Sequence, residues 1–253
     1  MRRNISSLTI VFCIVLLATA FTNFSFSQEQ QEPQSSLMVD IQVKPGMQFE
    51  FEKFLKDELI PAMKKGGSQE LGVWNRAVFG TANNYILSMP MTGMAEFDNP
   101  PAMFTALGQY GAQAMLSKMT QFADSARIYA ITQLPDLAIA SQDGYVPKIG
   151  FHARATVAPG RDAEYLKNAK VVSDLIKKTS AKGFYAHRVG IGGNPNQFYF
   201  LVLLDSFADM EVWGQSFQKA VAGTEMPSMA GIVQLMEYSM YGYNAELSIR
   251  PAQ

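Results

Sequence analysis

Cysteine and histidine are scarce in this chain of 253 residues, which contains one Cys and two His. That scarcity excludes a disulfide framework and a zinc site built from several Cys and His side chains, and we expect no metal site. An excess of positive charge is also missing, because 21 Lys and Arg stand against 22 Asp and Glu. A formal net charge of −1 offers no broad surface for nucleic acid, so no nucleic-acid partner is expected.

A long hydrophobic run is missing as well. The run near the N-terminus, residues 8–20, falls short of the about 20 residues that span a bilayer. Arg2 and Arg3 precede this run, and Ser25-Phe26-Ser27 follows it with small residues at the two positions that a signal peptidase reads, which is the pattern of a secretory signal peptide. We therefore predict a signal peptide over 1–27, cleavage after Ser27, a secreted or periplasmic protein, and no stable membrane span after cleavage. An uncleaved membrane anchor is the alternative.

Cleavage at that point would leave a chain without cysteine, because the single cysteine is Cys13. Stability would then come from packing alone. The polar segment that follows, residues 28–36 (QEQQEPQSS), has the composition of a disordered tether.

An internal duplication organises the rest of the chain. Val43-Lys44-Pro45-Gly46 is echoed by Val157-Ala158-Pro159-Gly160, Gly72-Val73-Trp74 by Gly183-Phe184-Tyr185, and Pro135-Asp136-Leu137 by Ala245-Glu246-Leu247. The matches keep their order and their spacing drifts slowly, which predicts two related repeats. We place the first repeat at 37–140, a linker at 141–147 and the second repeat at 148–250.

Each repeat carries the same series of hydrophobic periodicities. Alternation predicts strands and a 3.6-residue period predicts helices, which gives the order βαββαβ twice. In the first repeat, Pro61 should kink or end the first helix. The first repeat reads as strand 37–43, a helix carrying Phe51 to Leu59, strands 73–79 and 85–91, helix 101–122 and strand 127–133. The second reads as strand 149–157, helix 162–178, strands 183–190 and 197–204, a helical region 207–236 broken at Pro227, and strand 237–243.

This order resembles the dimeric α+β barrel superfamily, and within it the duplicated single-chain members near NIPSNAP and antibiotic-biosynthesis-monooxygenase-like domains. The resemblance covers residues 37–250 and rests on element order, the strand-Pro-Gly-helix entry and the turns at Pro135-Asp136-Leu137 and Ala245-Glu246-Leu247. It implies an α+β fold in which two tandem ferredoxin-like repeats form an intramolecular pseudo-dimeric barrel around a central cavity. Some members of the superfamily oxidise quinols without a cofactor, and others bind or degrade haem.

Polar side chains on the first strand of each repeat are the first candidates for a site. In the second repeat His152 and Arg154 lie opposite the apolar face of strand 149–157, and Asp40 is the repeat equivalent of Arg154. If the apolar faces pack on helices, these polar residues point into the barrel. A buried unpaired charge is costly, so Asp40 and Arg154 either pair with each other or contact a ligand.

Aromatic and cationic side chains share a face of the second strand of each repeat. Trp74 and Arg76 in the first repeat correspond to Tyr185 and His187 in the second. Such a wall suits a flat or anionic organic ligand, and core packing of Trp74 is the alternative. His152 and His187 could act as acid, base or haem ligand or be structural, and the intervening strand should hold their rings about 10 Å apart.

Other motifs are excluded by their context. The glycines at 190–193 lie between two strands with no helix start after them, so they predict a hairpin loop rather than a phosphate site. A nucleophile elbow of the form G-x-S-x-G is missing, so a hydrolase triad has no support.

The leading prediction is a secreted barrel that binds a small hydrophobic or aromatic ligand through Asp40, Trp74, Arg76, His152, Arg154 and His187. The alternatives are a cofactor-independent monooxygenase or haem-binding protein, and a structural or interaction module whose barrel is filled by side chains. No cofactor is assigned, haem being the one considered. The sequence leaves catalysis, the catalytic residues and the choice between monomer and homodimer open.

Overall fold

The structure is a computed structural model that describes residues 34–76 and 78–250, with the side chain of Arg76 outside the described part. The predicted signal peptide and residues 28–33 of the predicted tether therefore lie outside the described residues. Strand β1 begins at Ser35, so the last two residues assigned to the tether belong to the barrel.

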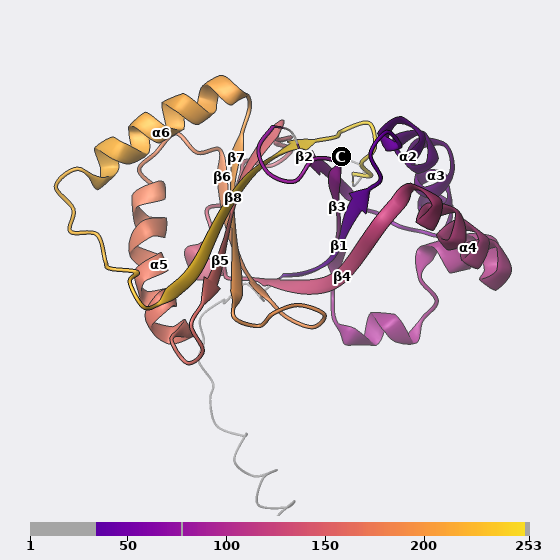
Figure 1. Ribbon diagram of the computed structural model, residues 1–253, viewed down its shortest axis with the longest axis horizontal. Coiled ribbons are helices and arrows are strands. Elements are labelled where there is room, and N and C mark those ends of the chain that lie inside the picture. The colour runs from indigo at the N-terminus through magenta and orange to yellow at the C-terminus, as the bar shows by residue number, and fades with distance from the viewer. Residues whose placement is uncertain (1–33, 77, 251–253) are drawn as a thin grey trace, which may run out of the picture. The chain divides into compact units, whose positions relative to one another are not determined.

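Eight antiparallel strands close into a barrel in the order β1-β3-β2-β8-β5-β7-β6-β4 (Figure 1). The first repeat consists of β1 (Ser35–Val43), α2 (Gln48–Phe54), η1 (Leu55–Leu59), α3 (Ile60–Lys65), β2 (Gly72–Arg76), β3 (Asn84–Met91), η2 (Met94–Asp98), α4 (Ala102–Phe122), β4 (Ala123–Gln133) and η3 (Pro135–Leu137). The second consists of β5 (Ile149–Val157), α5 (Asp162–Ile176), β6 (Gly183–Val189), β7 (Gln197–Leu204), α6 (Phe207–Val221) and β8 (Val233–Tyr243).

Each repeat forms a four-stranded sheet of ferredoxin-like order, β4-β1-β3-β2 in the first and β8-β5-β7-β6 in the second. The two sheets join at both edges, where β2 pairs with β8 and β4 pairs with β6. Pairing every edge leaves no open strand in the barrel. The predicted α+β fold with two ferredoxin-like repeats and an intramolecular barrel is confirmed.

Helices cover the outer face of each sheet, α2, α3 and α4 on the first repeat and α5 and α6 on the second (Figure 1). The first-repeat core includes Ile41, Val43 and Phe51, and the second includes Val157 and Tyr165, so the apolar strand faces pack outward on helices. A smaller cluster of Tyr129, Ile131, Val189 and Tyr199 lies inside the barrel. Successive side chains alternate between these two faces, as the period of a strand requires.

Pro61 does not end the first helix. The helix instead passes through the π-helical turn η1 and continues as α3, which has Pro61 in its first turn. Proline lacks an N–H and its ring crowds the carbonyl four residues earlier, and a wider turn relieves both problems.

The prediction for the last helical region was wrong beyond Val221. Helix α6 ends there, Gly223 and Gly231 have φ of 81° and 69°, and β8 already begins at Val233. The left-handed Gly223 ends the helix, Gly231 precedes β8, and Pro227 lies in the irregular segment between the two glycines. Strand β4 likewise begins at Ala123, four residues before its predicted start, because it pairs with β1 along its length.

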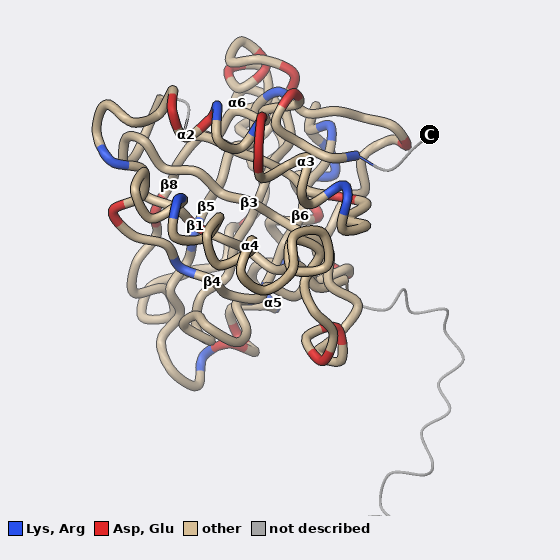
Figure 2. The backbone as a smooth tube through the Cα atoms, turned by 90° about the vertical axis from the view of Figure 1, so that its right-hand side faces the viewer, with Lys and Arg blue, Asp and Glu red and all other residues tan. Residues whose placement is uncertain are grey.

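Charged residues of both signs are spread over the surface, while the tube over α4 is almost free of them (Figure 2). Lys118 is the single charged residue among the 21 of α4. Within the described part of the chain, no helix combines the length and the apolar character needed to cross a membrane.

Candidate functional site

Two adjoining cavities occupy the interior of the barrel. One has a volume of about 210 Å³ and the other of about 150 Å³. Both are lined by the same five residues, Ile86, Tyr129, His152, Tyr199 and Tyr241. The 210 Å³ cavity, called the inner cavity below, is mainly aromatic and apolar, and the 150 Å³ cavity, called the polar end, carries the charges.

The predicted strand faces are confirmed for both repeats. Met38 and His152 line the inner cavity, and Asp40 and Arg154 line the polar end. The barrel therefore brings polar side chains from the first strand of each repeat into one connected space.

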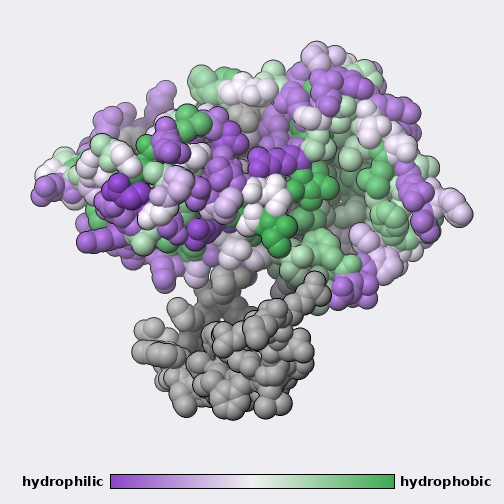
Figure 3. All heavy atoms as spheres, turned by 60° about the horizontal axis from the view of Figure 1, so that its bottom comes forward, coloured by the Kyte–Doolittle hydropathy of each residue, from purple (hydrophilic) through white to green (hydrophobic). Residues whose placement is uncertain are grey.

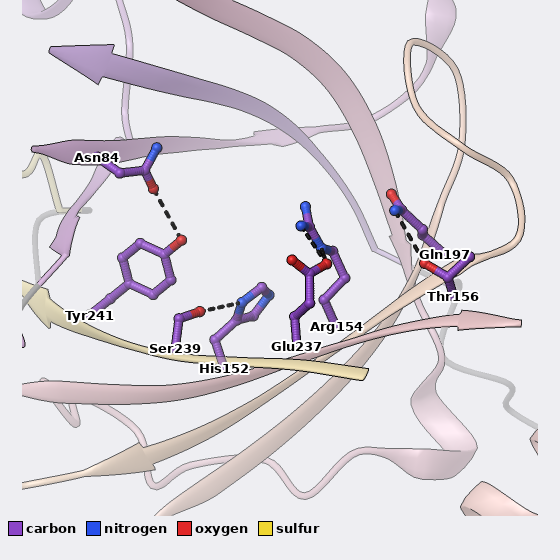
Figure 4. A network of polar contacts seen from close by, with 8 residues as sticks. All are labelled: Asn84, His152, Arg154, Thr156, Gln197, Glu237, Ser239 and Tyr241. Carbon is purple, nitrogen blue, oxygen red and sulfur yellow. Dashed lines mark hydrogen bonds and ion pairs between the residues drawn. The ribbon is translucent and has the colours of Figure 1, made fainter. Parts of the chain in front are cut away.

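Arg154 forms an ion pair with Glu237 of the neighbouring strand. The two residues face each other in the register of β5 and β8, and Glu237 Oε2 lies 2.6 Å from Nη2 and 2.8 Å from Nε (Figure 4). Burial lowers the pKa of the guanidinium, but the hydrogen bonds with Glu237 and Tyr199 outweigh it, so the pKa is raised overall. Arg154 is therefore a permanent cation.

Of the two alternatives for Asp40 and Arg154, the mutual ion pair was wrong. Asp40 Oδ1 accepts a hydrogen bond of 2.5 Å from Asn84 Nδ2, and Asn84 Oδ1 accepts one of 3.1 Å from the hydroxyl of Tyr241. The ion-pair partner of Arg154 is Glu237 because it stands directly opposite on an adjacent strand, whereas Asp40 belongs to the other sheet. The Asp40–Asn84–Tyr241 chain joins the two repeats across the barrel.

His152 lies among aromatic rings at the boundary of the two cavities. Its Nδ1 is 3.3 Å from the hydroxyl of Ser239 (Figure 4), and its ring centroid is 5.0 Å from that of Tyr199 and 5.7 Å from that of Tyr241. The contact with Ser239 fixes the orientation of the imidazole, so that Nε2 points away from Ser239.

His187 lines the same inner cavity as His152. The two histidines stand on strands that β7 separates, as predicted. Burial lowers the pKa of His187 to about 4, so its imidazole is neutral near pH 7. No described residue makes a hydrogen bond with this ring, which therefore offers a neutral acceptor to the cavity.

Trp74 and Tyr185 both line the inner cavity, as the shared strand face predicts. Trp74 packs edge-on against Tyr243, with 4.9 Å between ring centroids. The hydroxyl of Tyr185 lies 2.9 Å from Ser141 Oγ. The side chain of Arg76, the remaining predicted site residue, lies outside the described part.

Residues of β7, β4 and β8 complete the site and were missed by the sequence analysis. Tyr129 and Tyr199 lie with ring centroids 6.0 Å apart, and burial together with Tyr199 raises the pKa of Tyr129. Glu237, Ser239 and Tyr241 alternate along β8 and all line the polar end. Their alternation within the predicted strand 237–243 was a usable signal, but the sequence does not show which face of that strand lies opposite Arg154 and His152.

A separate apolar cavity of about 210 Å³ lies behind the second sheet, under α5 and α6. Phe151, Phe200, Trp213 and Phe217 are among its lining residues. Trp213 is 8% exposed and its indole Nε1 is buried without a hydrogen-bond partner. This cavity can accommodate an apolar group but has no titratable side chain other than tyrosine.

A further apolar groove of about 480 Å³ lies behind the first sheet, bordered by β1, β3 and the start of α4. A space-filling view of the side that faces down in Figure 1 shows hydrophobic side chains around a hollow (Figure 3). Both repeats thus leave space between the sheet and the second helix.

A haem group does not fit the barrel interior. The two connected cavities, of about 210 and 150 Å³, together lie only at the lower limit of the roughly 300–1,000 Å³ of pockets for drug-sized ligands, and the rings of Tyr129, Tyr199 and Tyr241 border both. Among the described residues, no three His, Cys, Asp or Glu side chains are grouped to hold a metal ion.

Comparisons with known proteins find neither a matching family model nor a matching curated sequence. Solved structures do match. They include a monooxygenase-like protein of Fusobacterium nucleatum (TM-score 0.56, 10% identity, 84% of this chain and 93% of that one) and an anthrone oxidase-like protein (0.55, 9%, 85% and 92%). A chlorite dismutase variant of Candidatus Nitrospira defluvii, in complex with cyanide, matches with a TM-score of 0.54 at 4% identity, over 86% and 93% of the two chains. The chain has the dimeric α+β barrel fold of these proteins, in a single-chain duplicated form.

Proposed function

We propose that the barrel interior binds a small, neutral aromatic molecule that carries a hydroxyl group. The observation that carries the proposal is the meeting of an aromatic wall with a hydrogen-bonding end in two connected cavities. Trp74 and Tyr185 supply flat apolar surface, and His187 supplies an acceptor. Small-ligand sites combine these two features, a largely apolar lining and a few placed polar groups.

The charges at the polar end favour a neutral ligand over a carboxylate. Among the described lining residues, Asp40 and Glu237 are acidic, Arg154 is already paired with Glu237, and His152 is the other basic side chain. A carboxylate ligand would lie beside two carboxylates with no unpaired Arg or Lys among the described lining residues, and repulsion between like charges in a partly buried space is costly. A phenolic hydroxyl can donate to these oxygens or to His187 without that cost.

Titration with 2-naphthol and 2-naphthoate tests the proposal. Both molecules contain the same fused rings, but 2-naphthol has a neutral hydroxyl group where 2-naphthoate has a carboxylate. Isothermal calorimetry at pH 6.5 should show saturable 2-naphthol binding, weakened about tenfold by His187→Phe through the loss of one hydrogen bond. Trp213→Phe, in the separate cavity, is the matched control and should bind as the parent does. Equal affinity for the carboxylate, or no saturable binding of 2-naphthol, would contradict the proposal.

A second candidate function is the oxidation of such a ligand by O₂ without a cofactor. The monooxygenase-like and anthrone oxidase-like proteins that share the fold support it. An activated ring CH₂ would become C=O. One oxygen atom of O₂ would become the carbonyl oxygen, and the other would leave as water together with both hydrogens. His187 would accept the first proton. Oxygen uptake with anthrone, compared between the parent and His187→Phe, tests this function without any added reductant.

We further infer that the chain is exported and that residues 1–27 are removed. The run at 8–20, the preceding Arg2 and Arg3, and the small residues Ser25 and Ser27 before the cleavage point support this. N-terminal sequencing of the exported protein should begin at Gln28. A first residue at Met1 would instead favour the uncleaved anchor.

A further inference from the structure

One end of the barrel opens into a third space, called the vestibule here, with a volume of about 400 Å³. Its walls include Tyr145 of the linker between the repeats, Tyr243 and Arg250. Trp74 and Ser88 line both the vestibule and the inner cavity. These two side chains therefore form the partition between the vestibule and the proposed ligand site.

The indole of Trp74 is held by ring contacts alone. It packs edge-on against Tyr243, and no described residue accepts a hydrogen bond from its Nε1–H. Glycines stand on both sides of the ring. A Cβ at Gly150 would lie 3.0 Å from Cζ3 of the indole, and one at Gly72 would lie 3.4 Å from its Nε1. A side chain at Gly150 would crowd the ring, whereas the contact at Gly72 is an ordinary one, and no hydrogen bond with a described residue has to break when the ring moves.

Tyr185 occupies the equivalent position in the second repeat but is held differently. Its hydroxyl lies 2.9 Å from Ser141 Oγ and accepts a hydrogen bond of 3.1 Å from the backbone N–H of Ser141. Moving this ring would break both contacts, which are partly buried. Tyr185 is therefore held by hydrogen bonds, whereas Trp74 is not. Trp74 is the one of the two that lines the vestibule.

We propose that Trp74 is the gate through which ligands enter the inner cavity from the vestibule, while Tyr185 is a fixed plug. The gate makes Trp74 a determinant of which aromatic molecules reach the cavity. The ligand-selecting role rests on the proposed function, whereas the gating itself can be measured without any ligand.

Thiol labelling measures access to the cavity directly. Ile131 is 5% exposed and lines the inner cavity from β4, so Ile131→Cys places a thiol behind the gate. Methyl methanethiosulfonate is the probe, and the parent chain, whose one cysteine is Cys13, gives the background rate. Ser117→Cys on the exposed surface of α4 is the control for reagent reactivity.

In the Ile131→Cys background, Trp74→Ala should speed labelling at least tenfold and Trp74→Phe should speed it less. Tyr185→Phe, which releases the ring from Ser141, should also speed it less than Trp74→Ala does, because Tyr185 does not line the vestibule. The rate of Ser117→Cys should not respond to Trp74→Ala. A circular dichroism melt of each variant shows that it is folded, and Trp74→Phe keeps the test valid if the alanine variant does not fold. Unchanged labelling in both Trp74 variants, or equal acceleration by Tyr185→Phe, would overturn the gate. Failure of 2-naphthol to bind would overturn the proposed function instead and leave the labelling result in force.

Discussion

Arg154 on β5 and Glu237 on β8 stand directly opposite each other in the strand register and form an ion pair, with 2.6 Å between Nη2 and Oε2. The pair neutralises the positive charge of Arg154, and Asp40 is a second carboxylate that lines the same cavity. The chemistry of the cavity is therefore set by this pairing, and its selectivity can be changed by single neutral substitutions.

Glu237→Gln should raise the affinity for 2-naphthoate about tenfold, because it frees the charge of Arg154 for the ligand carboxylate. The affinity for 2-naphthol should change less than about threefold, since a hydroxyl depends less on charge. Asp40→Asn removes the other carboxylate and is the matched variant, with the same direction of change. Calorimetric titration of both ligands measures the shift, and an unchanged 2-naphthoate affinity in both variants would contradict this account of the polar end.

The neutral state of His187 makes the stability of the protein depend on pH. Its folded pKa of about 4 lies below the value of 6.5 expected in the unfolded chain, so the unfolded chain takes up the proton first. The free energy of unfolding should be fully retained above pH 6.5 and fall as the pH drops toward 4, by at most about 3 kcal/mol. Urea unfolding at pH 7 and pH 4.5 measures this loss.

His187→Gln is the variant that isolates this effect from the carboxylates. It should lose less stability between pH 7 and pH 4.5 than the parent, with the difference approaching the His187 contribution. Lys219→Gln, at an exposed position of α6, is a control for a general change of charge. Equal losses in the parent and in His187→Gln would show that the imidazole is not held neutral by the fold.

The hydrogen-bond chain through Asn84 should stabilise the barrel. Asn84 is 6% exposed and links Asp40 of the first repeat to Tyr241 of the second. Asn84→Ala would leave the buried Tyr241 hydroxyl and the half-buried Asp40 carboxylate without this partner and should lower the free energy of unfolding by about 1–3 kcal/mol. Tyr241→Phe should cost about 1 kcal/mol, and a double-mutant cycle measures the coupling between them. Strictly additive effects would mean that the bond adds no stability.

The two repeats should unfold as one unit. The β2–β8 and β4–β6 pairings close the barrel, and separating the sheets would expose four strand edges together with the interior cluster of Tyr129 and Tyr199. Differential scanning calorimetry should show one transition whose calorimetric and van't Hoff enthalpies agree. Two resolved transitions would instead mean that each repeat is stable alone.

Strand faces and repeat order were predictable because they depend on local patterns. The alternation of His152 and Arg154 with apolar neighbours is enough to place both inside the barrel, given that helices cover the other face. The partner of Arg154 was not predictable in this way. Glu237 was taken as the first residue of a short strand, and only the full length of β8 sets the register that puts it opposite Arg154.

Properties that depend on burial could not be predicted from the sequence either. The lowered pKa of His187 results from its burial, and the hydrogen bond between Tyr185 and Ser141 joins a strand to the linker between the repeats. Trp74 and Tyr185 look interchangeable in the aligned repeats, yet their surroundings make one fixed and leave the other held by ring contacts. Such differences arise from tertiary contacts that a repeat alignment cannot contain.

The central claim is that the aromatic ligand binds inside the barrel, and the two tryptophans of the chain test it most directly. Trp74 lines the inner cavity and Trp213 the separate cavity behind the second sheet, so a ¹⁵N-labelled sample gives one indole N–H signal from each. Trp74→Phe and Trp213→Phe assign the two signals. Titration with 2-naphthol should shift the Trp74 signal saturably while the Trp213 signal stays in place. A saturable shift of the Trp213 signal alone would place the ligand behind the second sheet and contradict the account.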